Sequence, residues 1–302
     1  MKYKKILIGI PCYNEEKTIQ KVVEDFKKEL PEAKILVVDN NSKDRTAEEA
    51  RKAGAAVVKE KKQGKGFAVQ KILQNFKEDF LVLVDGDDTY IAKDIHKLLE
   101  IAKNEEADMV VGNRILKENQ KAFSTAHWWG NKILTLTLNL LFGTKIKDME
   151  SGYRVFNKNF TDSCILITEG FGIEPEFTIQ AIENKFTIKE APVSLQLRTA
   201  GVSKLNTLRD GSIVLYTIFS LFRDYKPLQF FGFFSIISFI LGSILAWRGI
   251  YDFLETGIVI HLPSLVTGSF LILFSFISVI AGLILSSLKR RHDELAHLIR
   301  KK

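Results

Sequence analysis

Three aspartates occur within four positions directly after a short apolar run, in the segment LVLVDGDDTY that spans residues 81–90. Asp85 and Asp87 are two residues apart, so a tight turn would aim both carboxylates at one point. Carboxylate oxygens suit Mg²⁺ or Mn²⁺, and such ions often take their remaining ligands from phosphates and water. A divalent ion would also neutralise a departing diphosphate. The alternative is a solvated aspartate-rich turn, and a lone D-x-D motif does not decide between the two.

The sequence around this turn predicts the elements that position it. The first half of the chain alternates short, unbroken apolar runs with helix-like segments. This alternation predicts a mostly parallel α/β sheet whose strands are buried on both faces. The predicted strands are 5–10, 34–38, 56–59, 80–84 and 109–112, and the predicted helices lie near 16–30, 44–53, 66–76 and 92–103. Ligands of such sheets bind at the carboxyl ends of the strands, where polar segments follow here.

Composition excludes several classes of protein. The chain has 302 residues, a net charge of +7 and two cysteines, Cys12 and Cys164. Two cysteines provide neither a disulfide framework nor metal-ligand spacing, which fits a reducing compartment. The basic residues are scattered or flank apolar segments, and no nucleic-acid motif occurs, so we expect no nucleic-acid partner. The apolar run near the N-terminus is too short for a signal peptide and is interpreted as the first strand.

Two long apolar segments near the C-terminus predict a membrane protein. Residues 228–250 and 264–288 each have the ~20 residues needed to cross a bilayer. The alternative is a pair of buried helices in a soluble domain. Arg248 lies near the end of the first segment. Further basic residues flank the outer ends of both segments, whereas the connecting loop 251–263 has no lysine or arginine, so the positive-inside rule predicts cytosolic N- and C-termini. The flanking basic residues are Arg223, Lys226, Lys289, Arg290 and Arg291.

Two further apolar segments, 127–143 and 208–227, are too short or too interrupted to span a bilayer. They carry tryptophan, tyrosine or basic residues near their ends. They are therefore interpreted either as helices in the headgroup plane or as ordinary core helices.

A series of motifs, which includes the acidic turn, resembles the motifs of a known protein family. The N-terminal half resembles a family 2 glycosyltransferase of the GT-A fold, a Rossmann-like fold with a mostly parallel sheet. With its two spans, the chain is most similar to the polyprenyl-phosphate (dolichol-phosphate) sugar synthases, which are inverting nucleotide-sugar transferases. The motifs that carry the resemblance occur in family order and are PCYNEE, VVDNNSKDRT, KKQGKGFAV, VDGDDTY, ADMVVGNR, DMESGYRVF, IEPEFT and RTAGVSKL.

The resemblance implies a domain organisation. We expect a GT-A catalytic domain at 1–206, an interfacial helix or linker at 207–227 and a two-helix transmembrane domain at 228–288. A basic cytosolic tail at 289–302 completes the chain. The spans either only anchor the domain or also help assemble homo-oligomers.

The resemblance also implies roles for individual residues. The metal ligands are Asp85 and Asp87, with Thr89 at a position where many of these synthases carry a glutamine, which leaves the third ligand open. The implied nucleotide-binding residues are Pro11, Tyr13, Glu15, Asp39, Lys65, Gly66, Asp85 and Gly86, with Gly64 in the same flexible loop. The residues implied at the acceptor are Arg114, Ser151, Gly152, Arg154, Arg198, Ser203 and Lys204, and those implied in catalysis are Asp85, Asp87, Arg114, Arg198 and Lys204.

The implied acceptor decides what chemistry the site needs. A phosphate monoester is already largely ionised at neutral pH, so transfer to polyprenyl phosphate needs cations for positioning more than a general base. Transfer to a lipid-linked or polysaccharide hydroxyl would need a base, with Asp148, Glu174 and Glu176 as candidates. A catalytically dead, membrane-tethered binding protein is the alternative from another class. UDP-glucose, UDP-N-acetylglucosamine and GDP-mannose are the expected donors, and the DGDDTY form favours a UDP-sugar.

Overall fold

The computed structural model describes residues 5–116, 118–119, 123–170, 172–197 and 207–300. The chain forms two compact units, Met1–Ile218 and Phe219–Lys302. The division falls within helix α8 (Thr207–Tyr225) rather than at its start.

In the described part of the first unit, seven strands form one sheet in the order β3-β2-β1-β4-β6-β5-β7. Neighbouring strands pair in parallel except at β6, which runs antiparallel to both β4 and β5. The strands are β1 (Ile6–Cys12), β2 (Lys34–Asp39), β3 (Ala56–Lys59), β4 (Phe80–Leu83), β5 (Met109–Asn113), β6 (Arg154–Asn157) and β7 (Ile188–Pro192).

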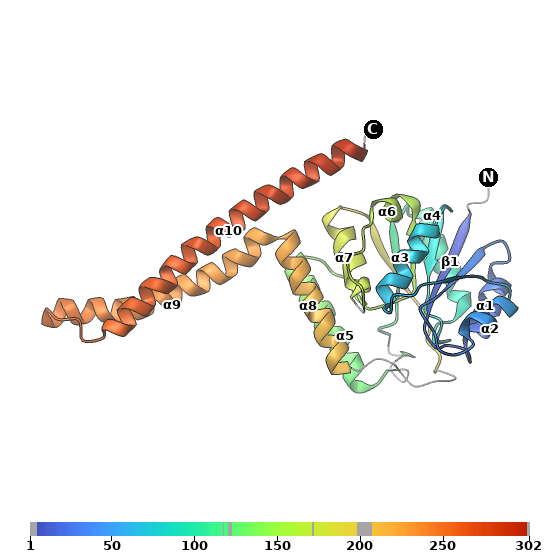
Figure 1. The fold of residues 1–302 in the computed structure, drawn as a ribbon, viewed down its shortest axis with the longest axis horizontal. Coiled ribbons are helices and arrows are strands. Elements are labelled where there is room, and N and C mark those ends of the chain that lie inside the picture. The colour runs from blue at the N-terminus through green and yellow to red at the C-terminus, as the bar shows by residue number, and fades with distance from the viewer. Residues whose placement is uncertain (1–4, 117, 120–122, 171, 198–206, 301–302) are drawn as a thin grey trace. The chain divides into compact units, whose positions relative to one another are not determined.

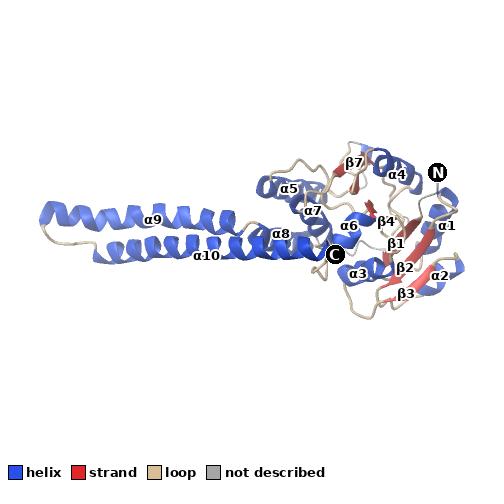
Figure 2. Cartoon of the chain, turned by 90° about the horizontal axis from the view of Figure 1, so that it is seen from above, coloured by secondary structure: helices blue, strands red, loops and turns tan. Residues whose placement is uncertain are grey.

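Helices cover both faces of this sheet (Figures 1 and 2). Along β1, Ile6, Ile8 and Ile10 enter one core cluster, and Leu7 enters the other. The first cluster takes the apolar faces of α1 (Ile19–Glu29), α2 (Thr46–Lys52) and α4 (Ile95–Asn104), which follows the short helix η1 (Ala92–Asp94). The second takes α3 (Lys65–Asn75), α6 (Lys158–Ser163) and α7 (Ile173–Glu183). Burial on both faces explains why the strands are unbroken apolar runs.

The predicted α/β fold is confirmed, with differences at the third quarter of the chain. All five predicted strands form, although β1 continues to Cys12 and β4 ends at Leu83. The prediction did not include β6, β7 or α6. Strand β6 has only four residues and begins with an arginine, and β7 (IKEAP) is interrupted by a lysine and a glutamate, so neither shows the apolar run that identified the other strands.

The second unit contains an antiparallel helix pair, α9 (Pro227–Thr256) and α10 (Leu262–Arg300). Both helices are long and apolar enough to cross a bilayer, and only 17% of each apolar window is buried within the chain. A core helix of a soluble domain would be mostly buried, so this exposure favours the membrane interpretation. Ser235 Oγ donates to the carbonyl oxygen of Ser275 (3.0 Å), and the backbones at Gly242 and Gly268 approach too closely for a Cβ.

The described part of the basic tail is helical, since residues 289–300 continue α10. Helix α9 likewise extends beyond the predicted span, so the connection between the two helices is only 257–261.

Candidate active site

The loops after β1 and β2 are hydrogen-bonded to each other at the carboxyl edge of the sheet. The Asn14 amide donates to Ser42 Oγ (2.9 Å) and the Glu15 amide donates to Thr46 Oγ1 (2.8 Å). Asp39 is only 3% exposed, and its Oδ1 accepts from the Ser42 amide at 3.1 Å. The parallel register pairs Pro11 with Val38 and Cys12 with Asp39. The first group of predicted nucleotide-binding residues therefore shares one edge: Pro11, Tyr13, Glu15 and Asp39.

The aspartates of the acidic turn after β4 differ in their exposure and in their partners. Asp88 adopts a positive φ of 60° and is 3% exposed. Its Oδ1 accepts from Lys21 Nζ (2.7 Å) and Gln196 Nε2 (2.8 Å). Asp85 keeps 29% of its side chain exposed, whereas Asp88 keeps 2%. Asp88 therefore anchors the turn, and Asp85 remains accessible.

Two threonines fix the backbone and side chains of this turn. Thr18 Oγ1 donates to the carbonyl oxygen of Gly86 at 2.8 Å, which ties the turn to the loop after β1. Thr89 Oγ1 donates to Asp87 Oδ1 at 2.7 Å. Thr89 is thus placed beside Asp87, and its role as a third metal ligand stays a prediction.

The donor set of the turn fits a substrate-completed metal site. Among the described residues, no group of three or more histidine, cysteine, aspartate or glutamate side chains is arranged to hold a metal. Asp85 and Asp87 supply hard oxygen ligands from one turn. Mg²⁺ commonly binds through one or two carboxylates together with phosphates and water. The two aspartates therefore suit an ion that arrives with a diphosphate rather than a closed structural site.

Lys65 is a largely buried cation next to the acidic turn. Its Nζ lies 2.6 Å from Asp85 Oδ1 and 2.7 Å from Glu174 Oε1. Burial acts against the charge of Lys65, but the two carboxylates outweigh it and raise the pKa of Lys65 above its ordinary value. The neighbouring Gly66 packs against the segment before α7, where its amide donates to the carbonyl oxygen of Glu169 at 3.0 Å. The glycine loop thus holds the protonated Lys65 next to Asp85.

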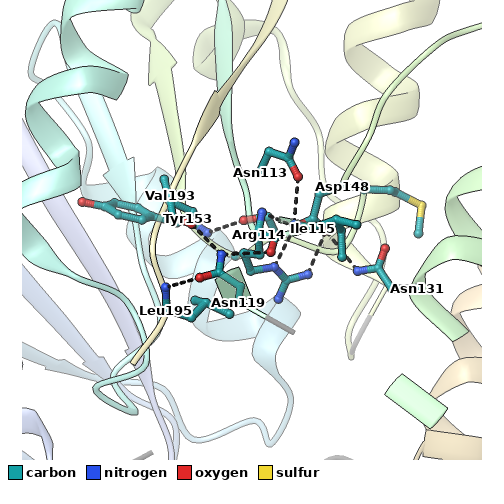
Figure 3. Close-up of polar contacts among 12 residues, drawn as sticks. Asn113, Arg114, Ile115, Asn119, Asn131, Asp148, Tyr153, Val193 and Leu195 are labelled. Carbon is teal, nitrogen blue, oxygen red and sulfur yellow. Dashed lines mark hydrogen bonds and ion pairs between the residues drawn. The ribbon is translucent and has the colours of Figure 1, made fainter. Parts of the chain in front are cut away.

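Arg114, the first residue after β5, is held by Asp148 through three hydrogen bonds (Figure 3). Its Nε and amide donate to Oδ2 of Asp148, each at 2.8 Å, and Nη2 donates to Oδ1 at 2.9 Å. Asn131 of α5 (Thr125–Phe142) donates to the same carboxylate at 3.0 Å. Asp148 has no exposed surface, and although burial raises its pKa, Arg114 lowers the pKa below its ordinary value. Arg114 is therefore a fixed, charged group with its side chain 14% exposed.

Asn119 fixes the loop that follows Arg114. Its Nδ2 donates to the carbonyl oxygens of Arg114 (2.9 Å) and Val193 (2.7 Å), and its Oδ1 accepts from the Leu195 amide (3.0 Å). These bonds join the loop after β5 to the segment after β7 (Figure 3).

The segment that contains Ser151, Gly152 and Arg154 packs against the acidic turn. Gly152 lies against Asp85 so closely that a Cβ would collide with the carboxylate, and its amide donates to Tyr90 Oη at 3.0 Å. Ser151 and Arg154 have no exposed surface. The Arg154 guanidinium donates to the carbonyl oxygens of Ser151 (2.8 Å) and Met149 and to Thr178 Oγ1 (3.0 Å). Ser151 and Arg154 are buried, which does not fit the expected contact with the acceptor. We interpret Arg154 as a residue that stabilises this segment through its hydrogen bonds.

Three of the predicted acceptor-side residues, Arg198, Ser203 and Lys204, lie outside the described residues.

Comparison with known proteins identifies the family of this chain. Residues 7–164 match the model of the family described as glycosyl transferase family 2. The chain is 30% identical over 281 residues to glycosyltransferase AglJ of Haloferax volcanii, covering 90% of this chain and 92% of that protein. The chain belongs to glycosyl transferase family 2. A dolichyl-phosphate hexose transferase of the same organism is 31% identical over 211 residues, covering 69% of this chain and 90% of that protein.

Solved structures confirm the fold of this family 2 glycosyltransferase. The glucosyl-3-phosphoglycerate synthase of Mycobacterium tuberculosis, in complex with Mn²⁺, UDP-glucose and phosphoglyceric acid, superposes with a TM-score of 0.60. The match covers 73% of this chain and 80% of that chain at 19% identity.

The carboxylates of this glycosyltransferase that were expected as general bases are all engaged. Asp148 binds Arg114 and Glu174 binds Lys65. Glu176 has no exposed surface, and its oxygens accept from the backbone amides of residues 167 (2.8 Å) and 168 (2.9 Å).

Glu150 is a site residue that sequence reasoning missed. It is partly buried and, within the described part of the chain, makes no hydrogen bond or ion pair. Burial raises its pKa to about 7, with Glu174 and Asp148 adding to the shift and Arg114 opposing it. Its place inside the motif DMESGYR was the only sequence signal that pointed to it.

Proposed function

We propose that this glycosyltransferase transfers a sugar, with inversion at the anomeric carbon, from a nucleotide sugar to a polyprenyl phosphate at the cytosolic face of a membrane. The observation that carries the proposal is that Asp148, Glu174 and Glu176 are each occupied by a cation or by backbone amides. These three carboxylates are therefore not available to accept a proton from the acceptor. An acceptor phosphate, already ionised, does not need one.

The proposed reaction is a single in-line displacement. An oxygen of the acceptor phosphate forms the new bond to the anomeric carbon while the bond from that carbon to the nucleoside diphosphate breaks. A Mg²⁺ or Mn²⁺ ion held by Asp85 and Asp87 would supply charge neutralisation for the departing diphosphate. Arg114, fixed by Asp148, would orient the acceptor phosphate through a charge-assisted hydrogen bond.

A UDP-sugar is the donor we favour. The Mycobacterium tuberculosis structure that shares this fold holds UDP-glucose with Mn²⁺. UDP-glucose and UDP-N-acetylglucosamine therefore come before GDP-mannose in the order of donors to test.

Helix α5 supports a membrane location for the transferase unit. One side of it exposes large apolar residues at helical spacing, with Trp129 59%, Ile133 59%, Leu136 68% and Leu140 81% exposed. Lys132 Nζ lies 5.0 Å from the ring centre of Trp128. A stripe of this kind bordered by tryptophan and lysine is typical of helices that lie in the headgroup plane. We accordingly place α5 at the membrane surface, with the helix pair α9–α10 as the anchor.

The direct test incubates the purified full-length chain in detergent with polyprenyl phosphate, Mn²⁺ or Mg²⁺ and each nucleotide sugar. The product is identified by mass spectrometry. We expect a polyprenyl-phosphate sugar that requires the metal and decreases at least about 100-fold in Asp87→Asn. Asp25→Asn, on the exposed face of α1, is the matched control and should retain activity. Donor hydrolysis without any lipid product would refute the phosphate acceptor.

Glu150 favours one competing function, transfer to a hydroxyl of a lipid-linked or polysaccharide acceptor. A carboxylate with a pKa near 7 is suited to act as a general base at neutral pH. In that case Glu150→Gln should lose activity by about 100-fold or more. Transfer to polyprenyl phosphate predicts that Glu150→Gln keeps most of its activity.

A further inference from the structure

A cavity of about 660 Å³ lies in the second unit, where the basic segment before α9 meets the basic part of α10. Its volume is within the range of sites that bind small molecules, roughly 300–1,000 Å³. The lining includes Tyr225, Lys226, Leu228, Lys289, Arg290 and Glu294. Neither the transferase chemistry nor the family motifs involve these residues.

The charge of the lining favours an anion. Lys226, Lys289 and Arg290 contribute three positive charges against the single carboxylate of Glu294 among the described lining residues. Glu294 is shared with an arginine outside the lining, because it accepts from Arg290 at 3.3 Å and from Arg291 at 3.0 Å. The described lining residues therefore carry a net positive formal charge.

Lys289 is held at the cavity wall by Tyr225. Its Nζ donates to the Tyr225 carbonyl oxygen at 2.6 Å and lies 5.0 Å from the centre of the tyrosine ring. Tyrosine and lysine at the end of an apolar span are typical of the interface between hydrocarbon and headgroups. The cavity consequently sits at the depth where lipid phosphates lie.

Helices α9 and α10 pack closely next to the cavity. A Cβ on Gly282 would lie 3.3 Å from the Cα of Leu228 and 3.1 Å from the Cβ of Phe231. Beyond this contact, α9 and α10 expose large apolar side chains such as Phe233 (60%) and Ile280 (55%). A headgroup would enter the basic cavity while its acyl chains follow these exposed surfaces.

We propose that this cavity binds the phosphate of an anionic phospholipid with a small headgroup, as a lipid site separate from the acceptor site of the transferase. The apolar surface next to the basic wall favours a lipid phosphate over free phosphate. The site needs the helix pair to lie in a membrane, as proposed above, but it does not depend on the transfer reaction.

The adjacent arginines provide a matched pair of variants. Arg290 and Arg291 share Glu294 as partner and are similarly exposed, at 83% and 78%, but only Arg290 lines the cavity. The full-length chain is reconstituted in nanodiscs of phosphatidylcholine with phosphatidylglycerol, extracted gently and analysed by native mass spectrometry. We expect retained phosphatidylglycerol to fall about fivefold in Arg290→Gln, since one basic group near lipid phosphates contributes ~1 kcal/mol. Arg291→Gln should retain it, and Lys289→Gln should lose it if that variant folds.

Each other outcome overturns the proposal. Equal losses in Arg290→Gln and Arg291→Gln would show diffuse attraction to the membrane surface, and equal retention in both would show that Arg290 does not bind the lipid. Displacement of phosphatidylglycerol by inorganic phosphate would make the site one for free phosphate. Failure of the wild-type chain to retain even phosphatidylcholine would refute the membrane placement instead, which separates the two failures.

Discussion

Lys65 forms a largely buried ion pair with Asp85, with Nζ 2.6 Å from Oδ1. The same ammonium lies 2.7 Å from Glu174, so one lysine pairs with two carboxylates, one of which is a proposed metal ligand. A divalent ion bound at Asp85 would therefore share this carboxylate with the ammonium of Lys65. The stability of the site would then depend on both cations.

Lys65→Met should destabilise the metal-free protein by roughly 3 kcal/mol, because breaking a buried pair leaves uncompensated charge. Added Mn²⁺ should raise the unfolding temperature more in this variant than in the wild type, since the ion replaces the missing positive charge. Thermal unfolding in detergent with and without Mn²⁺ measures both effects. Lys52→Met, which removes an exposed pair with Glu48 and Glu49, is the control and should change neither quantity appreciably. An equal Mn²⁺ effect in the wild type and Lys65→Met would contradict the shared role.

Gly152→Ala should impair transfer while the protein still folds. The added methyl group would collide with the Asp85 carboxylate and displace it from the edge of the sheet. A displacement of about 1 Å in a catalytic group can cost on the order of 100-fold in rate. Gly130→Ala on α5, where a Cβ meets nothing within 4 Å, serves as the control and should keep full activity. Steady-state rates of both variants at saturating donor test this prediction. A fully active Gly152→Ala would rule out the proposed support of Asp85.

Glu150→Gln should alter the pH dependence of stability. The pKa of Glu150 is raised from 4.5 to about 7 in the folded chain, so the folded state binds more protons than the unfolded state between these values. Stability contributed by the neutral form is therefore present below about 4.5 and is lost as pH rises through about 7. Relative to the wild type, Glu150→Gln should gain stability at alkaline pH, by at most about 3 kcal/mol. Unfolding midpoints across this pH range test it; a constant difference between the two proteins at all pH values would refute the prediction.

Polar substitution on the exposed face of α5 should uncouple the transferase from membrane-embedded acceptor. Leu136→Glu with Leu140→Glu should lower transfer to polyprenyl phosphate in vesicles by about tenfold or more, because both side chains would leave the apolar headgroup boundary. Hydrolysis of the nucleotide sugar, which needs no lipid, should stay near the wild-type rate. Leu136→Phe with Leu140→Phe keeps the face apolar and should transfer normally. Parallel loss of transfer and hydrolysis would point to misfolding of α5 rather than to membrane contact.

Much of the fold followed from local patterns. The unbroken apolar runs identified five strands of the sheet, and the uncharged C-terminal segments identified the helix pair, because burial on both faces and exposure to lipid each require continuous apolar sequence. The acidic turn was placed correctly for the same reason, since it directly follows a buried strand.

The polar contacts of the site depended on the tertiary structure. Lys65 and Glu174 are 109 residues apart and pair only because α3 and α7 pack on the same face of the sheet. Arg154 looked like an acceptor-binding cation, but an antiparallel strand carries it into the core, where carbonyl oxygens and Thr178 take its donors. Glu150 drew no attention in the sequence, and its raised pKa arises from burial near other carboxylates. Residue types and spacing determined the elements and the family of this protein. Which charges meet, and which are buried, was decided only by packing between segments distant in the chain.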